Sequence, residues 1–145
     1  MRAVIQRVKQ AEVKVGGRTV GAIGAGLLIL LAVHRNDLPP VVAKMGEKIL
    51  NLRIFSDEEG KMNRSLRQAG REILLVSQFT LYGDARKGNR PSFVESAEPQ
   101  KAKEYYQQLA EYLRSQDFRV ETGEFGAQME VALINDGPVT IILDI

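Results

Sequence analysis

Short apolar runs alternate along the chain with polar segments that contain glycine, proline or charged residues. Residues 13–15 and 19–20 are strand-like and flank Gly16 and Gly17, a pair that favours a tight hairpin because glycine reaches positive φ without a steric penalty. Residues 27–33 are apolar without interruption, which is typical of a strand buried on both faces. The pattern therefore predicts a sheet that begins near the N-terminus.

Two later segments show the three- and four-residue period of an amphipathic helix. In residues 99–115 the apolar positions are Ala102, Tyr105, Leu109 and Tyr112 or Leu113, and the opposite positions are Lys103, Gln107, Glu111 and Arg114. An earlier helix is predicted after Asp37, which can cap it, with Pro39 and Pro40 tolerated in its first turn. Its apolar face would contain Val41, Met45, Ile49 and Leu52. Both helices are expected to cover one side of the sheet, which predicts the α+β class, and the tyrosines of the later helix are expected in the core or at its rim.

The composition limits the class of protein. With 145 residues, of which 44% are hydrophobic and 26% charged, the chain fits one globular domain spanning residues 1–145. It has no cysteine, which excludes disulfides, thiolate catalysis and thiolate metal ligands. The longest apolar run is too short to span a membrane, and charged residues interrupt the N-terminal apolar positions. We therefore expect a soluble cytoplasmic protein.

Polar side chains follow the apolar run of residues 73–76, which reads as a buried strand. They belong to Ser77, Gln78 and Thr80. In an extended segment Gln78 and Thr80 would lie on the face opposite Ser77 and Phe79. A strand end is a rigid support for chemistry, but by themselves the residues favour ordinary hydrogen bonding of Ser77 and Thr80 to nearby backbone.

A second polar segment, Asn135-Asp136-Gly137-Pro138, separates residues 131–134 from residues 139–143, and both flanking runs read as strands. The segment suits a hairpin turn because Asn, Asp and Gly tolerate unusual φ values. Only roughly 5–6% of X-Pro bonds in folded proteins are cis. The sequence by itself therefore favours a trans Gly137–Pro138 bond.

The chain offers few side chains for acid–base or nucleophilic catalysis. His34 is the only histidine, and a lone histidine at the end of an apolar strand is usually structural or exposed. There is no Gly-x-Ser-x-Gly elbow, zinc-ligand cluster or phosphate-binding glycine motif. Ser77 and Thr80 have no obvious partner base, and an unassisted hydroxyl is a weak nucleophile. Taken alone, these residues favour a non-catalytic RNA-binding or small-ligand-binding module.

Three basic residues, Arg86, Lys87 and Arg90, occur between Ala85 and Val94 without an acid. The net charge of +2 and the pI near 9.0 are weak evidence for a nucleic-acid partner, so the local cluster carries more information. The cluster belongs either to a solvated surface loop or to a mobile loop that binds phosphates and releases counterions.

Six segments together resemble the D-aminoacyl-tRNA deacylase family, and the resemblance runs in order from Met1 to Ile145. They are Ile5-Gln6-Arg7-Val8, Arg53-Ile54-Phe55-Ser56-Asp57, Gly60-Lys61-Met62-Asn63, Ser77-Gln78-Phe79-Thr80-Leu81, Arg90-Pro91-Ser92-Phe93 and Asn135-Asp136-Gly137-Pro138-Val139-Thr140. The resemblance implies a homodimer whose single domain has a mixed, barrel-like β-sheet flanked by two main helices. It also implies a cytoplasmic hydrolase that cleaves the ester between tRNA and a D-amino acid or glycine without a cofactor.

The resemblance further implies that Ser77, Gln78, Phe79 and Thr80 form the catalytic segment. Its backbone N–H groups would stabilise the oxyanion, and the free hydroxyl of the terminal ribose would help to orient or activate water. Positioning of the ester is then favoured over covalent catalysis, because neither hydroxyl has a base beside it.

Substrate and tRNA contacts are implied in the same way. A cis Gly137–Pro138 corner would cross the dimer interface into the partner's pocket, bind the substrate's amino group and exclude L side chains. Phe125 and Met129 are candidate pocket walls, although core packing explains them equally well. The residues expected to contact tRNA are Arg86, Lys87 and Arg90, and no metal ligand is expected.

Overall fold

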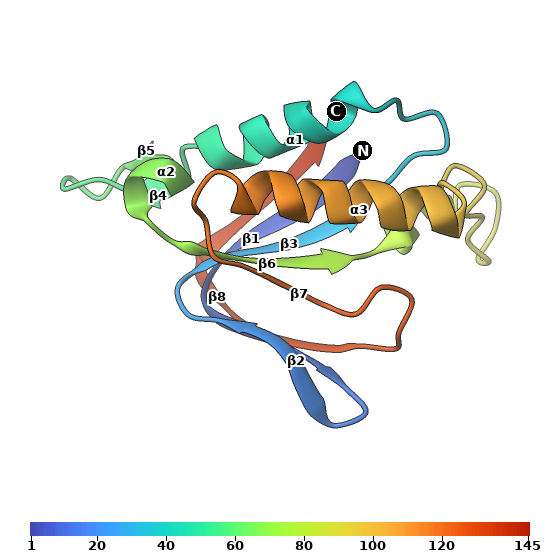
Figure 1. The fold of residues 1–145 in the computed structure, drawn as a ribbon, viewed down its shortest axis with the longest axis horizontal. Coiled ribbons are helices and arrows are strands. Elements are labelled where there is room, and N and C mark those ends of the chain that lie inside the picture. Colours follow the sequence, from blue (N-terminus) through green and yellow to red (C-terminus); the bar gives the residue numbers. More distant parts are fainter.

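The computed structural model describes residues 1–145 and is built around a six-stranded mixed sheet (Figure 1). In chain order the elements are β1 (Arg2–Val15), β2 (Arg18–Ile23), β3 (Gly26–Ala32), α1 (Pro40–Asn51), β4 (Phe55–Ser56), β5 (Met62–Arg64), α2 (Leu66–Ala69), β6 (Glu72–Ser77), a 3₁₀ helix (Phe79–Tyr82), α3 (Pro99–Arg114), β7 (Val120–Thr122) and β8 (Glu130–Asp144). The strands β4 and β5 form a separate small hairpin.

The long strand β1 organises the sheet. One of its edges pairs first with β3 and then with β2, and β8 runs antiparallel along the other edge. Beyond β3 the strands β6 and β7 add in parallel. The turn between β1 and β2 is the predicted hairpin, with φ values of 56° at Gly16 and 79° at Gly17.

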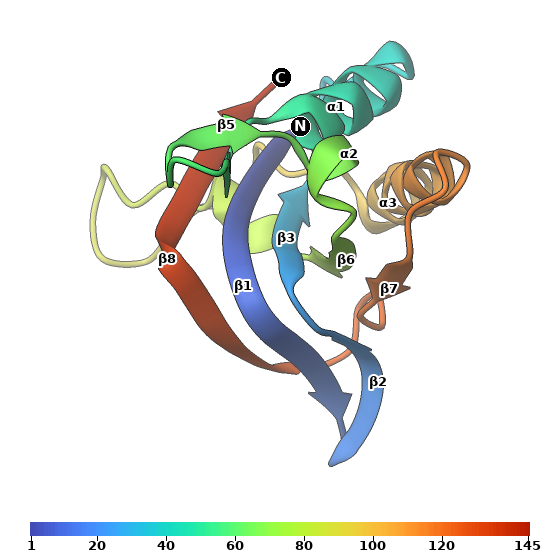
Figure 2. The ribbon, with the colours of Figure 1, turned by 90° about the vertical axis from the view of Figure 1, so that its left-hand side faces the viewer.

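The sheet curls so strongly that its two ends approach each other (Figure 2). A methyl group on Gly21 of β2 would lie 2.5 Å from the Thr122 carbonyl oxygen of β7, so these backbones are close enough to require glycine. The inner surface of the curl holds a small apolar cluster that includes Val13, Leu74 and Val76. The prediction of a mixed, barrel-like sheet is confirmed, and the barrel is nearly closed.

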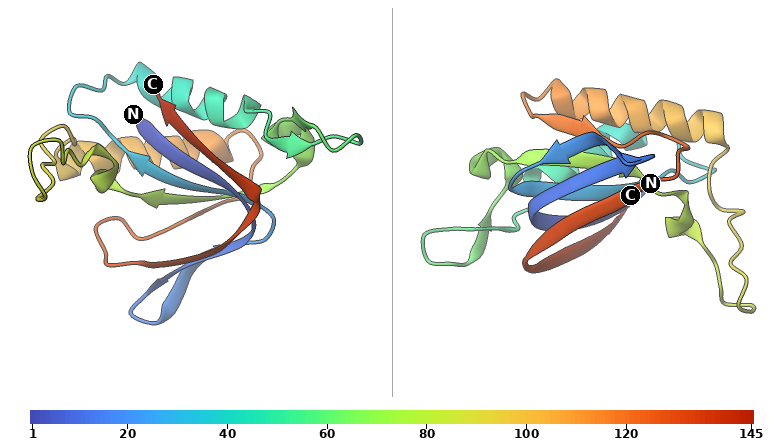
Figure 3. Two further views of the ribbon diagram at one scale, coloured as in Figure 1. Left: turned by 180° about the vertical axis from the view of Figure 1, so that it is seen from behind. Right: turned by 90° about the horizontal axis from the view of Figure 1, so that it is seen from below.

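Both main helices cover the same face of the sheet, as predicted (Figures 1 and 3). Their apolar faces and the strands beneath them bury one core of 24 residues. Tyr105 and Tyr106 lie in this core, and the Tyr106 hydroxyl donates a hydrogen bond of 2.8 Å to the Leu75 carbonyl oxygen. The tyrosines are therefore packing residues, as their spacing indicates. Neither helix carries an apolar run long enough to cross a bilayer.

Asp37 does not cap α1, so that prediction is wrong. The helix begins at Pro40 after Pro39 and has no side-chain cap. The Asp37 carboxylate instead accepts hydrogen bonds from the Met1 ammonium group, at 2.9 Å, and from the His34 backbone N–H, at 2.7 Å. The N and C termini lie side by side (Figure 3), and the Met1 ammonium also binds the Ile145 carbonyl oxygen at 2.7 Å. The Asp37 carboxylate, which the local sequence assigned to the helix N-terminus, therefore binds a partner that is distant in the sequence.

The two strands expected around Gly137–Pro138 are one continuous strand, β8, and the hairpin alternative is wrong. Both halves of β8 pair with β1, and register shifts opposite Val8 absorb the irregular segment. The Gly137–Pro138 peptide bond is cis, as the family resemblance implies. In a single chain β8 is an edge strand with one face open.

Candidate active site

A cavity of about 610 Å³ opens where β6 ends. Ser77, Gln78 and Phe79 line one side of it, and Phe125 and Met129 line another. The first three come from a strand end that was predicted to carry chemistry, and the last two come from the segment between β7 and β8. The structure therefore brings five of the predicted site residues to one largely apolar cavity.

The remaining predicted residues lie outside this cavity. Thr80 is in the next turn and is exposed. Gly137 and Pro138 are exposed on β8 and do not line the cavity of their own chain. One chain alone therefore does not unite the two segments expected to act together.

The 3₁₀ helix Phe79–Tyr82 changes the geometry expected after β6. An extended segment over residues 77–80 is wrong from Phe79 onward, because the chain leaves the sheet and turns there. Gln78 and Thr80 still meet, since the Gln78 amide donates a hydrogen bond to the Thr80 hydroxyl.

The turn leaves two backbone donors without a partner inside it, the N–H of Phe79, which lines the cavity, and the N–H of the next residue, Thr80. The first N–H groups of a helical turn have no partner inside it, and no side chain caps this one. The N–H groups of Phe79 and Thr80 also take part in none of the backbone hydrogen bonds outside the regular helices and strands. Two adjacent donors of this kind are suited to stabilising an oxyanion.

No side-chain base stands beside the Ser77 or Thr80 hydroxyl. His34 is engaged elsewhere: its Nδ1 accepts a hydrogen bond of 3.1 Å from the Asn36 N–H, and its Nε2 lies 2.8 Å from the Glu95 carboxylate. The Asn36 donor requires an unprotonated Nδ1, so Nε2 carries the proton and donates to Glu95. His34 lines a different cavity, beside Tyr82. The structure also contains no group of three metal-ligating side chains.

Arg7 holds the Gly137–Pro138 segment from behind. Its Nε lies 3.2 Å from both the carbonyl oxygen and the carboxylate of Asp136, and the Asn135 amide donates to the Arg7 carbonyl oxygen at 2.9 Å. Gly137 has a φ of 124°, and a methyl group there would lie 2.7 Å from Arg7 Nη2. Arg7 therefore supports a segment predicted to belong to the site, and the sequence analysis did not assign it this role. It stands in one of the segments that carried the family resemblance, but nothing local indicated its partner.

The outer face of β8 is apolar around this segment. Ile134 and Ile142 are 49% and 67% exposed, and Ala132 and Pro138 are also exposed. Because β8 is an edge strand, it also presents unpaired backbone groups. Such an edge with an apolar face is typical of an interface surface.

The basic loop is closed at its base by two backbone hydrogen bonds between Asp84 and Ser92, of 2.8 and 2.9 Å. Arg86 forms hydrogen bonds of 2.7 and 2.9 Å to the Asp84 carboxylate. Hydrogen bonds from Arg86 lower the pKa of Asp84 to about 2, so this ion pair persists at neutral pH. Lys87 and Arg90 are exposed and are the loop cations farther from this acid in sequence.

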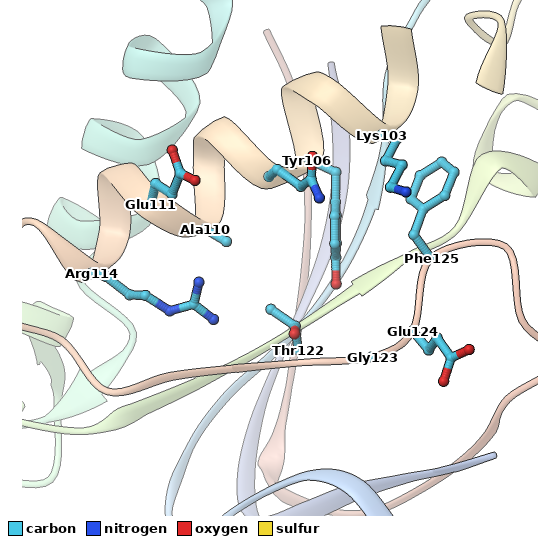
Figure 4. A pocket seen from close by; sticks show the side chains of 10 residues that line it. Lys103, Tyr106, Ala110, Glu111, Arg114, Thr122, Gly123, Glu124 and Phe125 are labelled. Carbon is cyan, nitrogen blue, oxygen red and sulfur yellow. The ribbon is translucent and has the colours of Figure 1, made fainter. Parts of the chain in front are cut away.

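A second cavity, of about 460 Å³, lies between α3 and β7 (Figure 4). Tyr106 and Phe125 line both cavities, and their ring centroids are 5.8 Å apart. Burial raises the pKa of Tyr106 to about 12, so its hydroxyl stays protonated at neutral pH. Side chains of both charges line this second cavity: Lys103 and Arg114 are basic, and Glu111 and Glu124 are acidic.

Comparison of the whole chain with known proteins identifies its family. The family model for D-Tyr-tRNA(Tyr) deacylase matches residues 4–144. The D-aminoacyl-tRNA deacylase of Thermosipho africanus is 58% identical, over 99% of this chain and 97% of the relative. That of Lactobacillus helveticus is 54% identical over 100% of both.

Two solved structures are similar to the fold. The c-Myc DNA unwinding element binding protein has a TM-score of 0.93 at 44% identity, covering 99% of this chain and 98% of that chain. A probable eukaryotic D-amino acid tRNA deacylase has a TM-score of 0.85 at 21% identity, with the same coverage, and supports the fold alone. From the family model and the full-length relatives, the chain belongs to the D-aminoacyl-tRNA deacylase family.

Proposed function

We propose that this protein hydrolyses the ester of D-aminoacyl-tRNA by positioning it against backbone donors, without a side-chain base. The observation that carries the proposal is the Phe79–Tyr82 turn, which begins at the wall of an apolar cavity and leaves its first two N–H groups without a partner in the turn. Family membership supplies the substrate class. The cavity supplies a place for the aminoacyl group in contact with Phe125 and Met129.

In the proposed reaction, water attacks the ester carbonyl carbon, and the negative charge that develops on the carbonyl oxygen is stabilised by the N–H groups of Phe79 and Thr80. The bond between the carbonyl carbon and the ribose oxygen then breaks, and that oxygen takes up the proton that the attacking water loses. The products are tRNA and a free D-amino acid. The neighbouring ribose hydroxyl orients the water, a role favoured by the absence of a base beside Ser77 or Thr80.

We further propose that two chains complete each site. The exposed apolar face of β8 supplies the dimer surface, and Gly137–Pro138 stands on that face instead of in its own chain's cavity. Across the interface, the corner would reach the partner's cavity and exclude L side chains by steric contact. Selection by backbone would leave the side-chain identity open and would also admit glycine.

The function is tested by incubating the protein with matched D-aminoacyl-, L-aminoacyl- and glycyl-tRNA and measuring ester loss. Rapid loss of the D-aminoacyl and glycyl esters with a stable L-aminoacyl ester is expected. Binding of all three without cleavage would instead support the non-catalytic binding module. Binding of duplex DNA should also be measured, because the name of one structural relative refers to a DNA element.

Replacing the free ribose hydroxyl beside the ester with hydrogen is expected to abolish turnover, whereas Thr80→Val is expected to retain measurable cleavage. The reason is that the ribose hydroxyl orients water, while the Thr80 side chain only accepts a bond from Gln78. Single-turnover rates with both substrates measure the difference. An acyl-enzyme trapped on Thr80 would refute this mechanism.

For the basic loop, we expect Lys87→Ala with Arg90→Ala to weaken tRNA binding and reduce its salt dependence. The slope of log K against log salt should fall by up to about 2, since each phosphate contact contributes roughly 0.9. Arg86→Ala should change it less, because Asp84 already neutralises Arg86. Filter binding at several salt concentrations measures the slopes, and an unchanged slope would make these residues ordinary surface charges.

A further inference from the structure

Ser96, which the sequence analysis did not single out, contacts the proposed oxyanion segment. Its hydroxyl donates a hydrogen bond of 2.9 Å to the Phe79 carbonyl oxygen. That carbonyl belongs to the same planar peptide group as the Thr80 N–H. Because the group is rigid, holding its oxygen also fixes the direction in which its N–H points.

The neighbouring donor, the Phe79 N–H, is oriented by a hydrogen bond within the turn itself. The Phe79 N–H shares a peptide group with the Gln78 carbonyl, and that carbonyl accepts a hydrogen bond of 3.1 Å from the Leu81 N–H within the turn. The Thr80 donor differs because a side chain from a distant segment contacts its peptide. A hydrogen bond to a carbonyl oxygen also polarises the peptide and strengthens its N–H as a donor.

Ser96 is held in place by a side-chain clasp, formed by His34 and Glu95. Backbone hydrogen bonds join the same two chain segments. The Arg35 N–H donates to the Glu95 carbonyl oxygen, and the Ala97 N–H donates to the Val33 carbonyl oxygen, both at 2.9 Å. The Glu95 carboxylate binds His34 Nε2 at 2.8 Å with one oxygen and Arg35 at 2.9 Å with the other. The segment that carries Ser96 is therefore fastened to the end of β3 on both sides.

We propose that Ser96 is a positioning residue for deacylation, which orients the Thr80 N–H toward the oxyanion, and that the clasp of His34 and Glu95 holds Ser96 for this role. The inference rests on the proposed function and adds a residue to it. It also gives the only histidine a role that requires no proton transfer.

The first experiment compares Ser96→Ala with Ser96→Thr and with the control Ser92→Ala, a change at the base of the same loop. Ser96→Ala should lower kcat by about 10-fold or more, since losing a whole oxyanion donor costs roughly 10²–10³ in kcat. The KM for tRNA and the unfolding temperature should change little. Ser96→Thr retains the hydroxyl and should restore most of the rate, and Ser92→Ala should cleave at the wild-type rate.

Two ligands separate orientation of the donor from general damage. Ser96→Ala should weaken binding of a tetrahedral phosphonate analogue of the aminoacyl ester, which mimics the oxyanion. It should leave binding of the planar amide analogue unchanged, because only the transition state depends on the Thr80 donor. Equal losses for both analogues would overturn the positioning role.

The clasp is tested by a double-mutant cycle. In the wild-type protein the ring centroids of His34 and Tyr82 are 5.1 Å apart. His34→Phe keeps an aromatic ring beside Tyr82 but removes the hydrogen bond to Glu95. It should lower kcat, and it should add nothing to Ser96→Ala if it acts only through Ser96. Additive losses of kcat would overturn the claim that His34 and Glu95 act through Ser96. An unchanged kcat in Ser96→Ala would overturn the positioning role of Ser96 but leave the proposed function standing. A wild-type protein without deacylase activity would overturn the function and this inference together.

Discussion

Gly137→Ala is expected to lower the rate of D-aminoacyl-tRNA cleavage by about 100-fold or more, because displacing a substrate-positioning segment by about 1 Å can cost that much. At a φ of 124° a side chain is rarely tolerated, and the new methyl group would lie 2.7 Å from Arg7 Nη2. Either the corner or Arg7 must then move. Single-turnover cleavage measures the rate, and filter binding should show nearly unchanged affinity for tRNA.

A matched control separates backbone strain from the clash. Gly17 also has a positive φ, of 79°, but a methyl group there would meet nothing within 4 Å. Gly17→Ala should therefore cost about 1–2 kcal/mol of stability from the left-handed conformation alone and leave cleavage near the wild-type rate. If Gly137→Ala cleaves as fast as Gly17→Ala, the corner has no role in the reaction.

Mixing subunits tests whether the corner acts across the dimer. One chain would carry Gly137→Ala, and the other would carry Ala127→Trp, which should fill the cavity that Ala127 lines. If each cavity uses the other chain's corner, one site of the mixed dimer carries both changes and the other carries neither, so activity should return. An inactive mixture with confirmed subunit exchange would refute the cross-subunit arrangement.

Asp37→Asn is expected to lower the free energy of unfolding by about 3–5 kcal/mol, the usual cost of removing one partner from a buried ion pair. The Met1 ammonium is fully buried and the Asp37 side chain is 9% exposed, so the remaining cation has no water to replace its partner. Asp37 also accepts the His34 N–H. Urea unfolding near neutral pH measures the change.

An exposed pair provides the comparison. Lys61 and Glu59 form an ion pair with side chains 74% and 70% exposed, and Glu59→Gln should change stability by less than about 1 kcal/mol. If Asp37→Asn lowers the free energy of unfolding no more than Glu59→Gln does, the buried pair contributes no more to stability than the exposed pair.

The sequence predicted the elements whose signals are local. Helix α3 follows from apolar residues at three- and four-residue steps, β3 from an unbroken apolar run, and the first hairpin from two glycines. The cavity residues Phe125 and Met129 could be named only through the family resemblance, because their spacing also fits core packing.

The features that were missed depend on contacts between distant segments. Asp37 binds Met1, 36 residues away, and Ser96 binds Phe79, 17 residues away. The continuity of β8 depends on register shifts that lie opposite Val8 in β1. In each case the isolated segment fits two structures equally well, and only the tertiary partner decides between them.

The pairing of β1 with β8 also has a consequence for synthesis. These two strands make the most extensive pairing in the sheet, and they join Arg2 to Asp144. Translation supplies β1 before every other strand of the sheet and β8 after them, so a growing chain carries the 14-residue strand β1 with one edge unpaired until β8 has been made. Contacts of such wide sequence separation form slowly. We therefore expect cooperative folding only once β8 has been synthesised and has left the ribosome, with chaperones protecting the open edge until then.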